Sequence, residues 1–195
     1  MKQGRGEVSA GFLLLLACFN FFDAQGLLPW ALAACALHEM GHCLVIWGFS
    51  RTITRIRITV SGAELQIQPP LNYAQEAVAA LAGPGVNFFL ALFFSYCDAF
   101  LLFAGMHFVS GCFNMIPLSR LDGGRALFAV TALLISPPAA ARVQVILDYV
   151  LTVLVIFMGI LLLFSCGNPT LLLVALWQGN CVLSAKKEDV NYCLY

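Results

Sequence analysis

The chain has very little charge. Charged residues make up 10% of its 195 residues, hydrophobic residues make up 61%, and the net charge is zero. The mean hydropathy is +0.89. Because a soluble globular domain carries about 25% charged residues, this composition excludes an ordinary soluble fold. We expect the lipid bilayer as a partner and no nucleic acid.

The chain also lacks any Cys-x-x-Cys pair, although it contains eight cysteines. This absence argues against a cysteine-bound zinc site. Most of the cysteines fall inside apolar segments, where cysteine behaves as a small hydrophobic residue. They therefore indicate packing positions rather than a disulfide framework.

Long apolar runs occupy most of the sequence, and a helix needs about 20 such residues to cross a bilayer. Six segments are of spanning or near-spanning length: 8–22, 27–49, 74–97, 99–116, 143–164 and 169–184. A further run, 125–135, is too short to cross and ends at Ser136-Pro137-Pro138, which predicts an interfacial or re-entrant helix. The sequence predicts an all-α polytopic membrane protein that is one intramembrane domain over residues 1–195, with no appended soluble domain.

Basic residues are missing from three of the connections between these segments. If the amino terminus is cytoplasmic, all ten Lys and Arg residues fall on the cytoplasmic side. The opposite connections hold Asp23, Asp98 and the turn at 166–168. By the positive-inside rule, this distribution predicts a multi-pass protein of the cell membrane with both termini in the cytoplasm.

One segment, 52–68, alternates apolar and polar residues instead of following the helical period. Ile56, Ile58 and Val60 fall on one side and Arg55 and Arg57 on the other. This pattern predicts a β-hairpin after the second span, with its turn at 61–63. Such a hairpin either connects two spans or pairs its free edge with an extended peptide.

Two histidines, His38 and His42, stand four residues apart inside the second apolar segment. On a helix, both imidazoles project from one face and can bind one Zn²⁺, which leaves Glu39 beside the metal-bound water. The apolar flanks offer no water-facing stripe on which these residues would simply be solvated, and ionisable residues inside a membrane segment are functional by default. The pattern predicts one zinc ion per chain and the ligands of a zinc hydrolase.

A catalytic zinc takes three protein ligands, so a third must come from elsewhere in the chain. The candidates in the apolar region are Asp122, His107, Asp148, Glu76 and a cysteine. Asp122 stands out because Pro117, Gly123 and Gly124 would break the helix around it and expose its carboxylate near the depth of His42.

Three ordered motifs resemble those of a known family. They are His38-Glu39-Met40-Gly41-His42, Gly83-Pro84-Gly85-Val86-Asn87, and Asn114-x-x-Pro117-x-x-x-Leu121-Asp122-Gly123. Together with the predicted hairpin, they resemble the site-2 protease family of intramembrane zinc metalloproteases. The resemblance is greatest to the compact branch that includes the sporulation sigma-factor-processing enzymes, and it covers about residues 30–130.

The resemblance implies that His38, His42 and Asp122 ligate zinc and that Glu39 is the general base. It also implies that Asn87 and Asn114 donate to the developing oxyanion or bind the substrate backbone, although amides in spans also serve as interhelical hydrogen-bonding groups. The family cleaves substrate helices within or beside the bilayer. The chain is accordingly predicted to be a zinc-dependent metalloendopeptidase that acts on membrane-protein substrates, with its catalytic core at about 27–135.

A different class of function remains open, namely a membrane metal-binding protein or metal transporter without protease activity. A transporter needs a path of ligands across the membrane. The predicted ligands cluster instead at one depth near the cytoplasmic side, which favours the protease.

Overall fold

The structure, a computed structural model, describes residues 5–9, 13, 16–17, 20–21, 23–59, 62–166 and 172. The chain divides into two compact units, Met1–Ala140 and Ala141–Tyr195. The predicted catalytic core at 27–135 falls entirely within the first of these units.

Three helices in the described part of the chain are long and apolar enough to cross a membrane. They are α2 (Leu28–Gly48), α3 (Tyr73–Phe94) and α6 (Pro137–Cys166). The predicted span at 99–116 forms α4 (Leu101–Asn114), whose 14 residues are fewer than a crossing needs. The segments 8–22 and 169–184 lie largely outside the described residues. The described part of the chain is therefore mostly helical with three candidate membrane-spanning helices, whereas the count of six spans stays a prediction.

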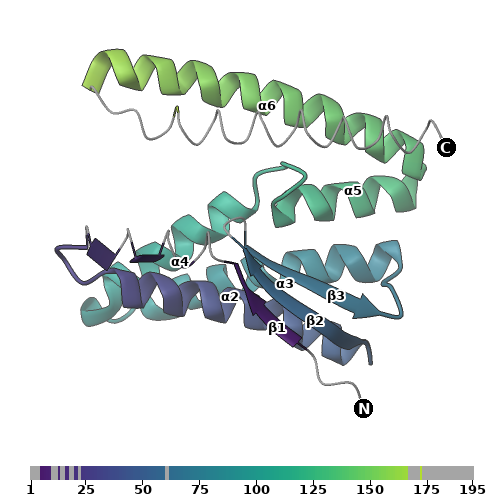
Figure 1. Ribbon diagram of the computed structural model, residues 1–195, viewed down its shortest axis with the longest axis horizontal. Coiled ribbons are helices and arrows are strands. Elements are labelled where there is room, and N and C mark those ends of the chain that lie inside the picture. The colour runs from purple at the N-terminus through teal and green to yellow at the C-terminus, as the bar shows by residue number, and fades with distance from the viewer. Residues whose placement is uncertain are drawn as a thin grey trace. The chain divides into compact units, whose positions relative to one another are not determined.

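Helix α3 is central to the first unit, because it packs against α2, α4 and α5 (Figure 1). Helix α5 (Asp122–Leu134) is the short helix predicted at 125–135, and a single 3-10 turn, η1 (Asp98–Phe100), leads into α4. The residues buried between the helices are mostly small, among them Ala34, Ala79, Ala80 and Ala104. Small side chains let helices approach closely where no hydrophobic effect drives their association.

At the starts of α2 and α3, side chains accept hydrogen bonds from backbone N–H groups that have no partner within the helix. The Asp23 carboxylate accepts from Leu27 and Leu28 at 2.9 and 2.8 Å, and the backbone bonds from Leu28 and then Leu27 lower the pKa of this carboxyl. Asn72 and Gln75 form a reciprocal capping box at the start of α3. These two helices carry most of the side chains that meet at the candidate site.

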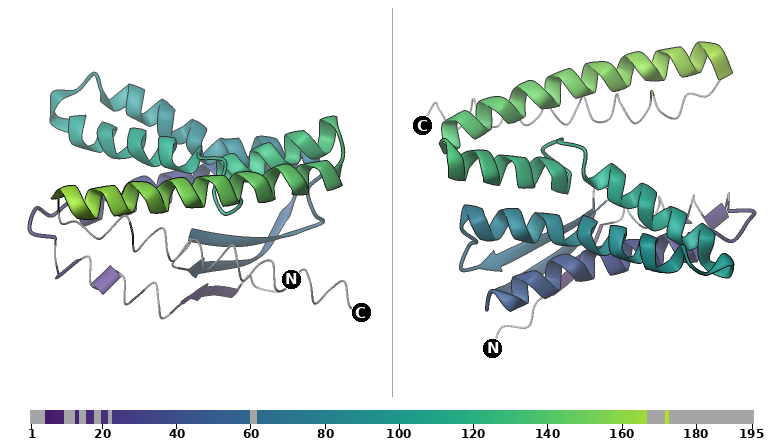
Figure 2. Two further views of the ribbon diagram at one scale, coloured as in Figure 1. Left: turned by 90° about the horizontal axis from the view of Figure 1, so that it is seen from above. Right: turned by 180° about the vertical axis from the view of Figure 1, so that it is seen from behind.

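The predicted hairpin is confirmed as strands β2 (Thr52–Thr59) and β3 (Gly62–Gln68), which pair antiparallel. A third strand, β1 (Arg5–Val8), pairs parallel with β2, so the strand order is β1-β2-β3. The three strands lie together on one side of the helices of the first unit (Figure 2). Assigning Val8 to the first apolar segment was therefore wrong: four residues give too short an alternation to reveal a strand, and β1 is held by its pairing with β2. Because β1 covers one edge of the hairpin, β3 is the outer strand on the other side.

The second unit contains most of α6, which includes the predicted span at 143–164. The helix begins at Pro137 and Pro138, in its first turn, where a missing N–H costs nothing. Gln144, Asp148 and Thr152 are buried at four-residue spacing along one face of α6, and Gln144 Nε2 donates to Asp148 Oδ1 at 3.2 Å.

Candidate metal centre

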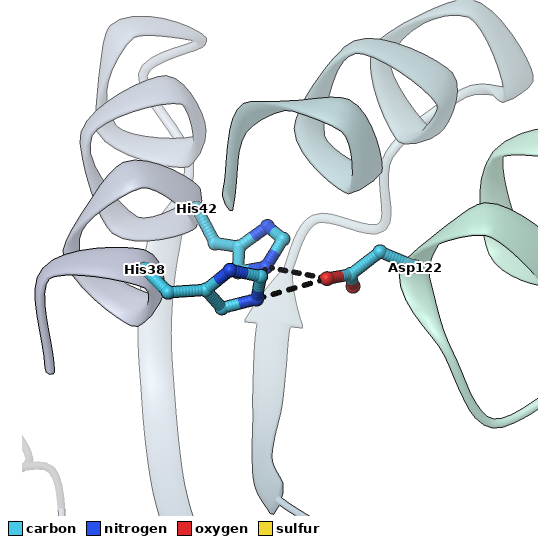
Figure 3. A group of neighbouring side chains, drawn as sticks. All are labelled: His38, His42 and Asp122. Atoms are coloured by element: carbon cyan, nitrogen blue, oxygen red, sulfur yellow. Dashed lines mark hydrogen bonds and ion pairs between the residues drawn. The ribbon is translucent and has the colours of Figure 1, made fainter. Parts of the chain in front are cut away.

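Three potential ligand atoms meet between α2 and the first turn of α5. His38 and His42 project from α2, and Asp122 reaches them from the first residue of α5 (Figure 3). Asp122 Oδ2 lies 2.9 Å from His38 Nε2 and 3.2 Å from His42 Nε2, and the two Nε2 atoms are 3.1 Å apart. All three residues are buried, and 80 residues of sequence separate His42 from Asp122.

The spacing of these atoms fits a zinc ion. Two ligands that are each about 2.0–2.1 Å from zinc, at the tetrahedral angle, lie about 3.3 Å from one another. The three observed separations, 2.9, 3.1 and 3.2 Å, are all close to that value. Two imidazoles and one carboxylate are also a donor set that catalytic zinc uses, leaving one position open.

Each imidazole is oriented by a hydrogen bond at its other nitrogen. His42 Nδ1 lies 2.7 Å from the carbonyl oxygen of Ala79, an atom that can only accept, so Nδ1 carries the proton and Nε2 keeps its lone pair. His38 Nδ1 lies 3.0 Å from the side-chain amide of Asn87 on α3. Both rings therefore present Nε2 toward Asp122.

The position of Asp122 depends on a close backbone approach before α5. A Cβ atom on Gly123 or Gly124 would come well under 3.0 Å from the backbone of Met115 or Leu118, a distance that real Cβ atoms essentially never show. The two glycines therefore let the 115–121 segment fold back against the start of α5. This close packing aims the Asp122 carboxylate at the histidines.

The second oxygen of Asp122 faces an arginine. Arg125 Nη1 lies 3.4 Å from Asp122 Oδ1, and Arg125 Nη2 pairs with Glu76 Oε1 of α3 at 2.7 Å. Arg125 thus links the metal-facing carboxylate to α3. From the sequence, Arg125 was a cytoplasmic charge, and Glu76 was either a candidate ligand or a hydrated residue near the end of its span. Nothing in the sequence shows that α3 and α5 are neighbours.

Gly83 of α3 lies close to both imidazoles. A Cβ atom at this position would lie 2.7 Å from His38 Cε1 and Nε2, and closer still to His42 Nε2. Sequence reasoning gave Gly83 no part in the metal site. The available signal was its position one helical turn before Asn87, which puts both residues on one face of α3.

The remaining predicted residues are placed as follows. Glu39 follows His38 on α2 and is partly buried. Asn114 ends α4, is partly buried, and its Nδ2 donates to the Ser110 carbonyl of its own helix at 3.1 Å. The roles assigned to Glu39 and Asn114 stay predictions.

Asn87 is fully buried and contacts the site from behind. Its amide lies 3.0 Å from His38 Nδ1, 3.1 Å from Ser110 Oγ and 2.9 Å from His107 Nδ1. His107, considered from the sequence as a possible third ligand, is likewise fully buried and lies on the far side of Asn87. The residue that joins His38 and His42 in the group of potential ligands is Asp122, and the ligand atoms of these three residues lie within 4.8 Å of one another.

Comparison with known proteins identifies the architecture. No protein-family model matches the chain, and no curated protein matches it significantly. Among solved structures, the Site-2 Protease from Methanocaldococcus jannaschii matches with a TM-score of 0.68 and 21% sequence identity, over 92% of this chain and 89% of that chain. The chain has the site-2 protease fold. Within the site-2 protease fold of this chain, a helix-borne histidine pair and a distant aspartate form a buried cluster that is compatible with zinc.

Proposed function

We propose that this protein is a zinc-dependent intramembrane endopeptidase of the site-2 protease family, which hydrolyses peptide bonds within or next to transmembrane segments of membrane-protein substrates. The observation that carries the proposal is the convergence of His38, His42 and Asp122 among helices apolar enough to cross a membrane. Buried ionisable groups in such surroundings are costly to keep without a function.

The donor set leaves Glu39 available for proton transfer. Zinc, when bound, supplies an acidified water and a Lewis acid that polarises the substrate carbonyl. His38, His42 and Asp122 are sufficient as protein ligands, so the Glu39 carboxylate is not required for coordination. It accepts a proton from the attacking water at one of its oxygens and returns the proton to the leaving amine nitrogen.

The substrate has to be extended before it can be cleaved, because a helical peptide shields its carbonyl groups. The three-stranded sheet offers a surface for this. Among the strands that the structure describes, β1 occupies one side of β2, so the outer edge of β3 is the edge available for pairing with an added strand. We propose that a segment of the substrate pairs with β3 and is thereby held extended near the metal.

The experiment that tests the proposed chemistry is Glu39→Gln in the purified full chain. Glutamine keeps the size and hydrogen bonding of the side chain but cannot take the proton, so cleavage of a membrane-embedded substrate should fall at least about a hundredfold. Zinc content should stay near one per chain. Met40→Leu is a matched control on the next residue, whose side chain is exposed, and should change neither quantity.

Cleavage by Glu39→Gln at the parental rate would refute the proposed chemistry. The transporter alternative has its own readout in sealed vesicles that contain the purified protein. Zinc flux that depends on His38 and His42 would favour transport over proteolysis.

A further inference from the structure

A chain of buried polar side chains runs from the metal site through three helices. His38 Nδ1 on α2 lies 3.0 Å from the amide nitrogen of Asn87 on α3, and Asn87 Oδ1 lies 2.9 Å from His107 Nδ1 on α4. Asn87 and His107 are fully buried, and His38 is 5% exposed. Because buried polar groups are costly unless they are hydrogen-bonded, the direction of each bond along this chain matters.

In the structure, the amide nitrogen of Asn87 faces His38 Nδ1 and donates a hydrogen bond to it. His38 Nδ1 is then the acceptor, and the ring carries its proton on Nε2. That proton faces Asp122 Oδ2 at 2.9 Å, where it forms a hydrogen bond. This direction gives His38 and Asp122 a hydrogen bond to each other.

A metal ion requires the opposite direction. His38 can ligate through Nε2 only if that nitrogen has a free lone pair, so its proton has to be on Nδ1, and Nδ1 must donate. Asn87 must then present its oxygen to His38. A half-turn of the amide achieves this without displacing any atom of the neighbouring helices, because the amide nitrogen and oxygen are nearly equal in size.

The half-turn brings Asn87 Nδ2 to His107, whose Nδ1 must change from donor to acceptor. An imidazole can make this change by carrying its proton on Nε2 instead. Within the part of the chain that the structure describes, His107 Nε2 is buried without a hydrogen-bond partner, so moving the proton to Nε2 breaks no bond of that nitrogen. The 3.1 Å bond from Asn87 Nδ2 to Ser110 Oγ reverses with the amide, because a hydroxyl can donate as well as accept. Each ring keeps one proton throughout, and the reversal leaves the charge of the protein unchanged.

We propose that Asn87 and His107 are positioning residues whose hydrogen bonds reverse direction when the metal binds, and which then hold His38 in its ligating tautomer. The inference deepens the proposed zinc site and rests on it. The hydrogen bond of His42 Nδ1 needs no such reversal, because the Ala79 carbonyl is an acceptor in both states. Full burial behind His38 sets this role for Asn87 apart from direct contact with a substrate.

The test is the metal affinity of the purified full chain, measured by competition with a chelator, together with the absorption spectrum of the Co²⁺-loaded protein. Asn87→Leu removes the acceptor for His38, so zinc affinity should fall about 10- to 100-fold and the cobalt spectrum should shift. Asn87→Asp keeps an acceptor toward His38 and should restore most of the lost affinity. Ser110→Ala is the matched control, because it removes a hydrogen bond to Asn87 without affecting the acceptor for His38.

A second pair of variants tests His107, the last residue of this hydrogen-bonded series. In the metal-bound direction Asn87 Nδ2 faces His107, so His107→Leu removes the acceptor of this amide nitrogen and should weaken zinc binding. His107→Asn supplies an amide oxygen near the position of the His107 Nδ1 atom and should restore the zinc affinity. Circular dichroism and thermal unfolding establish which variants are folded.

A folded Asn87→Leu variant with the parental zinc affinity and cobalt spectrum would overturn the proposal. If Asn87→Leu does not fold, equal zinc affinities of His107→Leu and His107→Asn would overturn it instead. Failure of the proposed function is seen separately in the parental protein. A parent that binds zinc but cleaves nothing would refute the protease and leave the role of Asn87 and His107 standing.

Discussion

Replacing Gly83 with alanine should strongly weaken metal binding, because the added methyl group would occupy the space between the two imidazoles. The new Cβ would lie 2.7 Å from both Cε1 and Nε2 of His38, and closer still to His42 Nε2. Carbon atoms in contact normally stay about 3.5–4.0 Å apart. The methyl group would therefore compete for volume with a zinc ion, which would lie about 2.0–2.1 Å from the same nitrogens.

The rings cannot move aside without loss, since each is held at its other nitrogen by Ala79 O or by the Asn87 amide. Overpacking of this kind costs about 1–3 kcal/mol. If that cost falls on the metal-bound state, zinc affinity drops by about 5- to 150-fold. We expect a loss of at least about tenfold, with cleavage reduced in parallel.

Chelator competition on purified variants measures this loss, and two other glycines provide controls. Gly85 lies on the same helix, and a Cβ atom added there would have no other atom within 4 Å. Gly85→Ala should therefore leave the zinc affinity unchanged. Gly41→Ala would place its Cβ 2.9 Å from both Ala82 O and Val86 Cγ2, which should lower the thermal stability through α2–α3 packing. Comparing the three variants separates an effect on the metal site from an effect on the fold. A folded Gly83→Ala protein that binds zinc as tightly as the parent would refute the reasoning.

Three further measurements test other parts of the protein. Asp122→Ala should reduce zinc affinity, whereas an unchanged affinity there, with loss in His107→Ala, would move the third ligand to His107. Tyr96 and Pro70 are both exposed, and a single cysteine can replace either of them in a cysteine-free background. A thiol reagent added outside the cell should label the cysteine at 96 and not the one at 70. The reverse labelling would contradict the cytoplasmic placement of both termini. Ile67→Pro removes a backbone donor from β3 and should weaken cleavage while zinc stays bound, so full activity in the folded variant would make the hairpin a simple connector.

Local sequence patterns were sufficient for several elements. The apolar runs located α2, α3 and α6, and the alternation at 52–68 located the hairpin, because helical and strand periodicities are properties of a few neighbouring residues. The four-residue spacing of His38 and His42 likewise placed two ligand atoms on one helix face, since a helix brings such residues together by its own geometry. The helix-breaking residues Pro117, Gly123 and Gly124 likewise predicted that the Asp122 carboxylate is exposed near His42.

Tertiary packing decided the rest, because the remaining contacts join residues that are far apart in the sequence. The four-residue strand β1 is recognisable only through its pairing with β2, and Arg125 joins Asp122 to Glu76 only because α3 and α5 are neighbours. The closeness of Gly83 to the histidine rings depends on how α3 is turned against α2. Asn87 and His107 were visible as isolated polar residues, but their connection to His38 exists only where α2, α3 and α4 pack together. No local pattern encodes these distances, since they follow from the way whole helices fit against one another.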